Sequence, residues 1–139
     1  MELSADATQT SDQEKPLYYT WDYEWIDFRG SVAYVGICPF KLTGIKEIQK
    51  IEFSKESDSK KVGEVIASIF YDDYKIDVHM PVSGKILSIN NALLTGNENI
   101  VLLEPESRGY IALIIPTYPL NRHGLIPSEK VSSLSKTIN

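Results

Sequence analysis

The residues whose side chains could do chemistry gather in one short stretch that holds Asp72, Asp73, Asp77 and His79. Carboxylates and an imidazole at this spacing are potential ligands of a divalent metal ion. The ordinary alternative is that aspartates in a turn accept hydrogen bonds from nearby backbone N–H groups. We favour this alternative and predict no metal site.

A second candidate for chemistry is Cys38, the only cysteine. Pro39 could begin a short helix, and a thiol at a helix N-terminus can have a lowered pKa. A single cysteine after an apolar strand is more often packed in the core, so we expect an inert thiol. The sequence shows no Ser/His/Asp arrangement, phosphate-binding loop or paired-carboxylate pattern. We therefore predict a protein without a catalytic site of its own.

The elements that must position these residues follow a period of two, which is typical of half-buried strands. In residues 74–80 Ile76 and Val78 point to one face while Lys75 and Asp77 point to the other. Residues 64–71 alternate in the same way. Only two residues separate these strands, so the pattern predicts a tight hairpin with its tip at Asp72 and Asp73.

Further short strands complete the expected architecture. We predict them at residues 18–20, 25–28, 31–37, 47–53, 85–89, 100–103 and 110–115. Pro39 and the pair Asn90–Asn91 are expected to begin short helical turns. Many short strands separated by turns favour a mainly β fold, either a sandwich or a small barrel.

Composition limits the classes of function. The chain has 139 residues, and its 14 Lys and Arg against 19 Asp and Glu give a net charge of −5, which disfavours binding to nucleic acid. No apolar run approaches the roughly 20 residues that span a bilayer. The polar N-terminus is unlike a secretory or transit peptide. We expect a cytoplasmic protein with a disordered tail at 1–16, a domain at 17–120 and a C-terminal extension at 121–139, a short helix or a tail.

Three blocks of sequence, taken in their order along the chain, resemble the blocks of a known protein family. The first is YYTWDYEWI at 18–26 followed by GSVAYVGI at 30–37, and the second is VGEVIASIFYDDYKIDVHMPVSGKILSINNALL at 62–94. The third is PESRGYIALI at 105–114. Together they resemble the glycine cleavage system H-protein family over most of residues 18–115.

The resemblance implies a barrel-sandwich hybrid of the lipoyl and biotinyl carrier type, with two small antiparallel sheets and short flanking helices. Members of this family are carriers. A lipoyl group on a lysine at a hairpin tip accepts the aminomethyl unit that the P-protein makes from glycine, and then visits the T-protein and the L-protein.

The family's attachment lysine is missing from this chain. In the family it stands eight residues before the Pro of Pro-Val-Ser-Gly and ten after the Gly of Gly-Glu; counted from Pro81 and from Gly63, both lead to Asp73. Phe70 stands where a glutamate is expected to be recognised by lipoate-attaching enzymes, and Tyr23 replaces a histidine. An aspartate forms no lipoyl amide, because attachment requires a neutral amine.

Lys75 is the nearest alternative attachment site. Alternation places it on the same face as Asp73, about 6.6 Å along the strand. We therefore expect no cofactor, or lipoate only if Lys75 carries it. The first case predicts a non-catalytic binding or regulatory homologue, and the second a working aminomethyl or acyl carrier with a non-standard attachment site.

The hairpin tip is also the expected partner-binding surface. It comprises Phe70, Tyr71, Asp72, Asp73 and Tyr74. Aromatic residues are favoured at the energetic centres of protein interfaces. The resemblance implies that the partners are the P-, T- or L-protein or lipoate-attaching enzymes, and an unrelated protein partner stays open. We expect no membrane partner, because no apolar run is long enough to span a bilayer. A third alternative is an unrelated β domain with a structural or interaction role.

Overall fold

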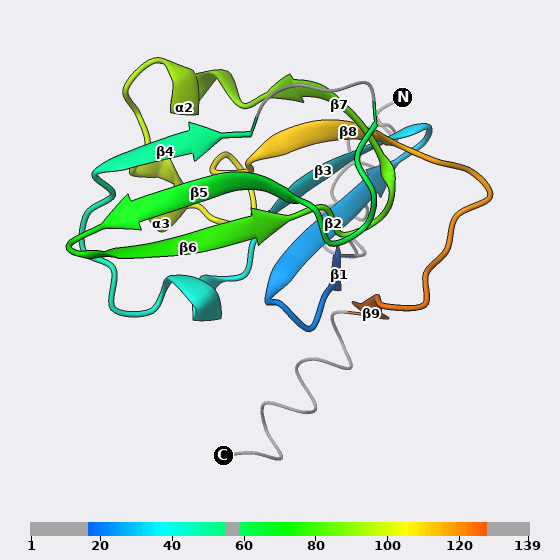
Figure 1. The fold of residues 1–139 in the computed structure, drawn as a ribbon, viewed down its shortest axis with the longest axis horizontal. Coiled ribbons are helices and arrows are strands. Elements are labelled where there is room, and N and C mark those ends of the chain that lie inside the picture. Colours follow the sequence, from blue (N-terminus) through cyan, green and yellow to red (C-terminus); the bar gives the residue numbers. More distant parts are fainter. Residues whose placement is uncertain (1–16, 55–58, 128–139) are drawn as a thin grey trace, which may run out of the picture.

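The computed structural model describes residues 17–54 and 59–127, which form two antiparallel sheets. The strands are β1 (Leu17–Tyr19), β2 (Glu24–Arg29), β3 (Val32–Ile37), β4 (Lys50–Phe53), β5 (Val65–Tyr71), β6 (Tyr74–His79), β7 (Gly84–Ile89), β8 (Ala112–Pro116) and β9 (Ile126–Pro127). Single helical turns lie at η1 (Pro39–Leu42), α2 (Asn91–Leu94) and α3 (Ile100–Leu103). The larger sheet has the order β7-β8-β3-β2-β1-β9 and the smaller one β4-β5-β6 (Figure 1).

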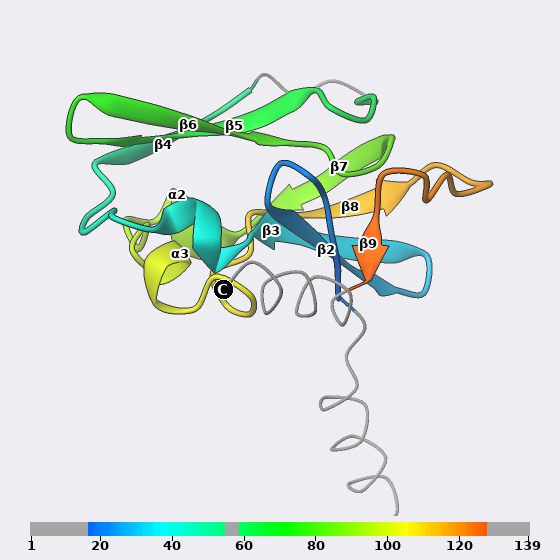
Figure 2. The same ribbon diagram turned by 90° about the horizontal axis from the view of Figure 1, so that it is seen from below.

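The two sheets pack face to face around one core. Figure 2 shows the smaller sheet lying over the larger one, with the helical turns gathered toward one end. Across the larger sheet Ile26 lies opposite Val35, and Val35 opposite Ala112. All three belong to the buried core, and so does Ile69 at the centre of the smaller sheet. In β8 buried positions alternate with more exposed ones, so its period of two arises from burial of one face, whereas residues 24–27 of β2 are all buried. The mainly β fold with two small sheets is confirmed.

Most predicted strands are present, with ends shifted by one or a few residues. Residues 100–103 were expected to form a strand and instead form α3, so that prediction is wrong. Glu104 N–H donates to the Ile100 carbonyl at 2.9 Å, which closes a helical turn. Val101 is fully buried while Leu103 is 75% exposed. A run of four apolar residues is too short for its periodicity to separate a strand from a helix.

Strand β9, at the C-terminal end of the described residues, pairs with β1 at their N-terminal end. Tyr18 pairs with Pro127 and Tyr19 with Ile126, so β9 continues the larger sheet beyond β1. A helix or a tail was expected here, and no strand was predicted. The expected tail at 1–16 and residues 128–139 lie outside the described residues, and the domain boundary at residue 120 stays a prediction. No helix in the described ranges is long and apolar enough to cross a membrane.

Candidate functional site

The β5–β6 hairpin ends in the predicted two-residue loop. Tyr71 pairs with Tyr74, and Asp72 and Asp73 connect them. Asp72 has a φ of 50°, and a positive φ at the first loop residue is a feature of the primed turns that suit the twist of a hairpin. The tip at Asp72 and Asp73 is therefore confirmed as a structural feature.

The side chains of the hairpin tip form an aromatic and acidic end to the smaller sheet. The rings of Tyr71 and Tyr74 lie 5.8 Å apart between centroids, and Tyr74 is 66% exposed. Asp72 and Asp73 are exposed. Phe70 is partly buried, with the Lys50 ammonium 4.9 Å from its ring centroid. The structure thus brings together all five residues predicted to bind a partner.

Lys75 lies beside the tip and within a strand. It pairs with Phe70 across β5 and β6, and its side chain is 53% exposed. Its Nζ is 3.8 Å from Asp77 Oδ1, a distance at which an exposed ion pair contributes little. Asp77 also accepts a hydrogen bond from the Ser68 hydroxyl at 2.8 Å. The Lys75 amine is therefore accessible, but Lys75 belongs to the strand and is the second residue after the loop.

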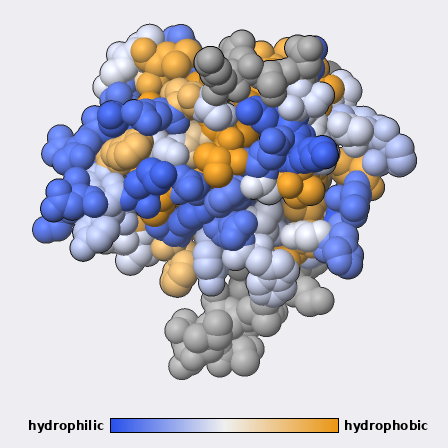
Figure 3. Space-filling model, in the orientation of Figure 1, coloured by the Kyte–Doolittle hydropathy of each residue, from blue (hydrophilic) through white to orange (hydrophobic). Residues whose placement is uncertain are grey.

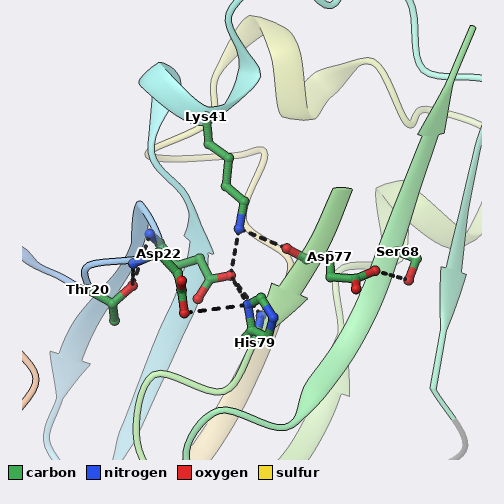
Figure 4. A network of polar contacts seen from close by, with 7 residues as sticks. Thr20, Asp22, Lys41, Ser68, Asp77 and His79 are labelled. Atoms are coloured by element: carbon green, nitrogen blue, oxygen red, sulfur yellow. Dashed lines mark hydrogen bonds and ion pairs between the residues drawn. The ribbon is translucent and has the colours of Figure 1, made fainter. Parts of the chain in front are cut away.

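A second polar site lies between the two sheets, where the β1–β2 turn approaches the end of β6 (Figure 4). Thr20 fixes the turn, because its hydroxyl oxygen accepts the backbone N–H groups of Asp22 and Glu24 at 3.2 Å each. Tyr23 between them has a φ of 61°, in the left-handed region. This tight turn places the carboxylates of Asp22 and Glu24 near the end of β6.

Glu24 is the centre of this site. Its side chain is 1% exposed, and its Oε2 accepts the His79 backbone N–H at 2.8 Å and the Lys41 ammonium at 3.0 Å. His79 Nδ1 lies 2.8 Å from the same oxygen and 3.9 Å from Asp22 Oδ2. We call Asp22, Glu24, Lys41 and His79 the Glu24 cluster. A buried carboxylate needs such partners, because an isolated buried charge is strongly unfavourable.

Lys41 joins η1 to the edge of the smaller sheet. Its ammonium donates to the Asp77 carbonyl at 2.8 Å as well as to Glu24. β6 is an edge strand, and two of its backbone groups are thus bonded by side chains in place of another strand. The Glu24 cluster therefore ties together the β1–β2 turn, η1 and β6.

Of the four residues that the sequence suggested as metal ligands, His79 alone belongs to the Glu24 cluster. Among the described residues, the acidic and histidine side chains close enough to share a metal ion are those of Asp22, Glu24 and His79, with ligand atoms within 4.8 Å of one another. Asp72, Asp73 and Asp77 do not join that group. Asp22, Glu24 and Lys41 were missed; the available signal was a glutamate inside the apolar run Tyr23 to Ile26.

Cys38 does not belong to the buried core cluster, so its expected packing in the core is wrong, and its inertness stays a prediction. It is half-buried, and burial is the main cause that raises the pKa of its thiol above the usual value. A raised pKa leaves less thiolate, which is the reactive form. η1 does begin at Pro39 as predicted.

The face of the molecule that is turned to the viewer in Figure 3 carries apolar patches between polar residues. Some aromatic residues of the N-terminal part are in the core, such as Trp25, which is 2% exposed. Others are not: Trp21 is 72% exposed and Phe40 is 64% exposed. The Phe40 ring packs on Tyr23 at 4.8 Å between centroids, next to the Glu24 cluster.

Comparison with known proteins identifies the family to which this chain is similar. A family model described as "Glycine cleavage H-protein" matches residues 17–138. The chain is 29% identical to the glycine cleavage system H protein of Bacteroides fragilis over 111 residues, 80% of this chain and 87% of that protein. It is 32% identical to that of Thermotoga maritima over 93 residues, 67% of this chain and 74% of that protein.

A solved structure agrees with the sequence comparisons. The fold matches the crystal structure of a glycine cleavage system H protein from Mycobacterium marinum with a TM-score of 0.71 and 19% sequence identity. The match covers 86% of this chain and 96% of the other. It supports the barrel-sandwich hybrid that the resemblance implied. The chain belongs to the glycine cleavage H-protein family.

Proposed function

We propose that this chain is an H-protein family member without a lipoyl arm, which acts by binding partner proteins through its hairpin tip. The observation that carries the proposal is the pair of loop residues, Asp72 and Asp73, which offer carboxylates where the family resemblance expects an amine. The tip residues therefore do not fit a lipoyl group.

The chemistry of attachment supports this proposal. A lipoyl amide forms when a neutral amine attacks an activated acyl group. The carboxylate of Asp73 is ionised at neutral pH and forms no amide. The aspartate side chain is also much shorter than lysine, so it provides no swinging arm.

The surface of the tip supports a binding role. Tyr71 and Tyr74 present aromatic rings beside the exposed carboxylates of Asp72 and Asp73. Such rings offer a large contact area at a low cost in side-chain entropy, which is why they are frequent in interface centres. We infer that the partners are the P-, T- or L-protein or lipoate-attaching enzymes. The chain would bind them without catalysing a reaction.

The setting that we infer is the cytoplasm. The single cysteine, which cannot form a disulfide within the chain, supports it, because proteins of reducing compartments rarely depend on disulfides.

A second candidate function is a carrier lipoylated at Lys75. The observation that favours it is the exposure of the amine, because the Lys75 side chain is 53% exposed and its ion pair with Asp77 is long at 3.8 Å. Against it, the amine projects from β6 and not from the loop. An attaching enzyme that recognises the loop would not select it.

Intact mass spectrometry of the protein from its native host separates the two candidates. The proposal expects an unmodified mass while an ordinary H-protein in the same cells is modified. An added lipoyl mass mapped to Lys75 within residues 62–85, and lost in Lys75→Arg, would establish the carrier function instead.

Partner binding is tested with the purified P-, T- and L-proteins and a lipoate ligase on a biosensor surface. Asp73→Ala and Tyr74→Ala should each weaken binding about tenfold, a typical loss for interface centres. The matched control is Tyr118→Ala, since Tyr118 is also an exposed tyrosine, at 53%, but lies in the loop after β8. Equal losses in all three variants, or no binding to any of the four proteins, would contradict the role of the tip.

A further inference from the structure

Three potential metal ligands meet in the Glu24 cluster from different parts of the chain. Asp22 belongs to the β1–β2 turn, Glu24 begins β2 and His79 ends β6. From this juxtaposition of Asp22, Glu24 and His79 we propose, in place of the absence of a metal site expected from the sequence, that the cluster is a Zn²⁺ site, a role separate from that of the hairpin tip.

The donor atoms and their spacing suit zinc. One imidazole nitrogen and two carboxylate oxygens are common ligands of Zn²⁺, with bonds of about 2.0–2.2 Å. Two ligands of a tetrahedral ion with such bonds lie about 3.4 Å apart. In the cluster His79 Nδ1 is 2.8 Å from Glu24 Oε2 and 3.9 Å from Asp22 Oδ2. Separations on both sides of the tetrahedral value require only small side-chain movements.

The three proposed ligands differ in how far their side chains are exposed to solvent. Glu24 is 1% exposed and held from several sides, so its oxygen is already desolvated and oriented. His79 is 25% exposed and Asp22 64% exposed, which leaves a route from solvent to the ligands. The turn that carries Asp22 is fixed by Thr20, so this exposed carboxylate has a defined backbone position. Three protein ligands with one open side match the sites in which zinc keeps a water molecule.

Lys41 is the competitor of the metal ion. Its ammonium now neutralises Glu24 at 3.0 Å. A zinc ion on Glu24 Oε2 must displace the ammonium from that oxygen, but Lys41 would keep the Asp77 carbonyl at 2.8 Å as its acceptor. The competition gives the proposal a distinctive consequence: removing the ammonium should strengthen metal binding, because it removes a positive charge from beside the site.

The test titrates Zn²⁺ into the full chain without an affinity tag, by calorimetry with a competing chelator. We expect one ion per chain, with the affinity lowered about tenfold or more in Asp22→Asn and His79→Gln, because each loses a ligand. The matched controls are Glu52→Gln, at an exposed carboxylate, and His123→Gln, at the exposed second histidine. Both should bind like the wild type, whereas Lys41→Met should bind about tenfold more tightly.

A second readout identifies the histidine. Addition of Zn²⁺ should shift the imidazole NMR signals of His79 and leave those of His123 unchanged. Affinity weaker than about 100 μM, or equal losses in the control and ligand variants, would overturn the proposal. If His79→Gln does not fold, Asp22→Asn decides the matter, since Asp22 is an exposed turn residue whose amide substitute keeps its size.

Discussion

Glu24 and His79 are joined twice through one oxygen atom: Glu24 Oε2 accepts the backbone N–H of His79 and contacts its ring Nδ1, both at 2.8 Å. The two residues lie on different sheets, so the contact fixes the start of β2 against the end of β6. Because the carboxylate is fully buried, the stability of the fold depends on the cation that accompanies it.

The first prediction concerns that cation. Lys41→Met should lower the free energy of unfolding by about 3 kcal/mol, because it leaves a buried carboxylate without its ion-pair partner. Urea unfolding at neutral pH measures the loss. Lys50→Met is the matched control, since the pair of Lys50 and Glu52 is 59% and 57% exposed, and it should cost below about 1 kcal/mol. Similar losses in both variants would contradict the buried ion pair.

The second prediction concerns close packing of β3 on β2. A Cβ atom added at Gly36 would lie 2.4 Å from Cζ2 of the Trp25 ring. Trp25 is 2% exposed and its indole N–H donates to the Pro105 carbonyl at 3.0 Å, so the ring has little freedom to move. Gly36→Ala should therefore destabilise the protein by about 3 kcal/mol in a urea titration. Gly124→Ala, where no atom lies within 4 Å of the added Cβ, should leave the midpoint almost unchanged.

The third prediction concerns a buried amide. Asn90 is 6% exposed, and its Nδ2 donates to the carbonyls of Arg108 and Tyr110 at 2.8 Å each. Asn90→Asp puts a carboxylate oxygen against two carbonyl oxygens and should cost about 3 kcal/mol at pH 7. The deficit should shrink as the pH falls toward about 4, because a protonated carboxyl can donate again. A deficit that does not change with pH, or an equal one in the exposed control Asn97→Asp, would contradict this account.

The fourth prediction concerns alkaline stability. Burial, followed by the hydrogen bond to Glu106, raises the pKa of the Tyr19 hydroxyl above its ordinary value of 10.0. The folded state then holds this proton more tightly than the unfolded chain. The contribution to stability is fully present below pH 10 and is lost as the pH rises above it. Between pH 8 and 10.5 the unfolding free energy of the wild type should fall more than that of Tyr19→Phe, and equal falls would contradict the shift.

The fifth prediction tests whether the departure from carrier function is confined to the tip. Phe70→Glu combined with Asp73→Lys should make the hairpin a substrate for a lipoate ligase in vitro, detected as one added lipoyl mass. The loop is exposed, and position 70 lies between Lys50 and Lys75 across the sheet, where a glutamate has favourable neighbours. Phe70→Glu alone should gain nothing at position 73. Failure of the double variant would mean that the recognition surface differs beyond the loop.

The strands and the hairpin could be predicted because their signals are local. Alternation in Tyr74 to His79 and the two-residue gap at Asp72 and Asp73 each lie within a few neighbouring positions. The helical turn α3 could not be predicted, because four apolar residues do not reveal their period. Its conformation depends on packing that the local sequence does not record.

The Glu24 cluster could not be predicted for a different reason. Glu24 and His79 lie far apart in the sequence, in strands of different sheets, and no sequence motif links the two residues. The sequence pattern grouped His79 with the hairpin aspartates, because alternation shows which residues share a face of one strand and does not show what packs against that face. Only the face-to-face packing of the sheets brings His79 to the β1–β2 turn.

The pairing of β1 with β9 has a consequence for synthesis of the chain on the ribosome. β1 can pair with β2 early, but its other side has no partner until residues 126 and 127 have emerged, more than a hundred residues later. A product that stops before Ile126 therefore retains an open strand edge, which can pair with another copy. Emergence of residues 126 and 127 is the step that closes this edge.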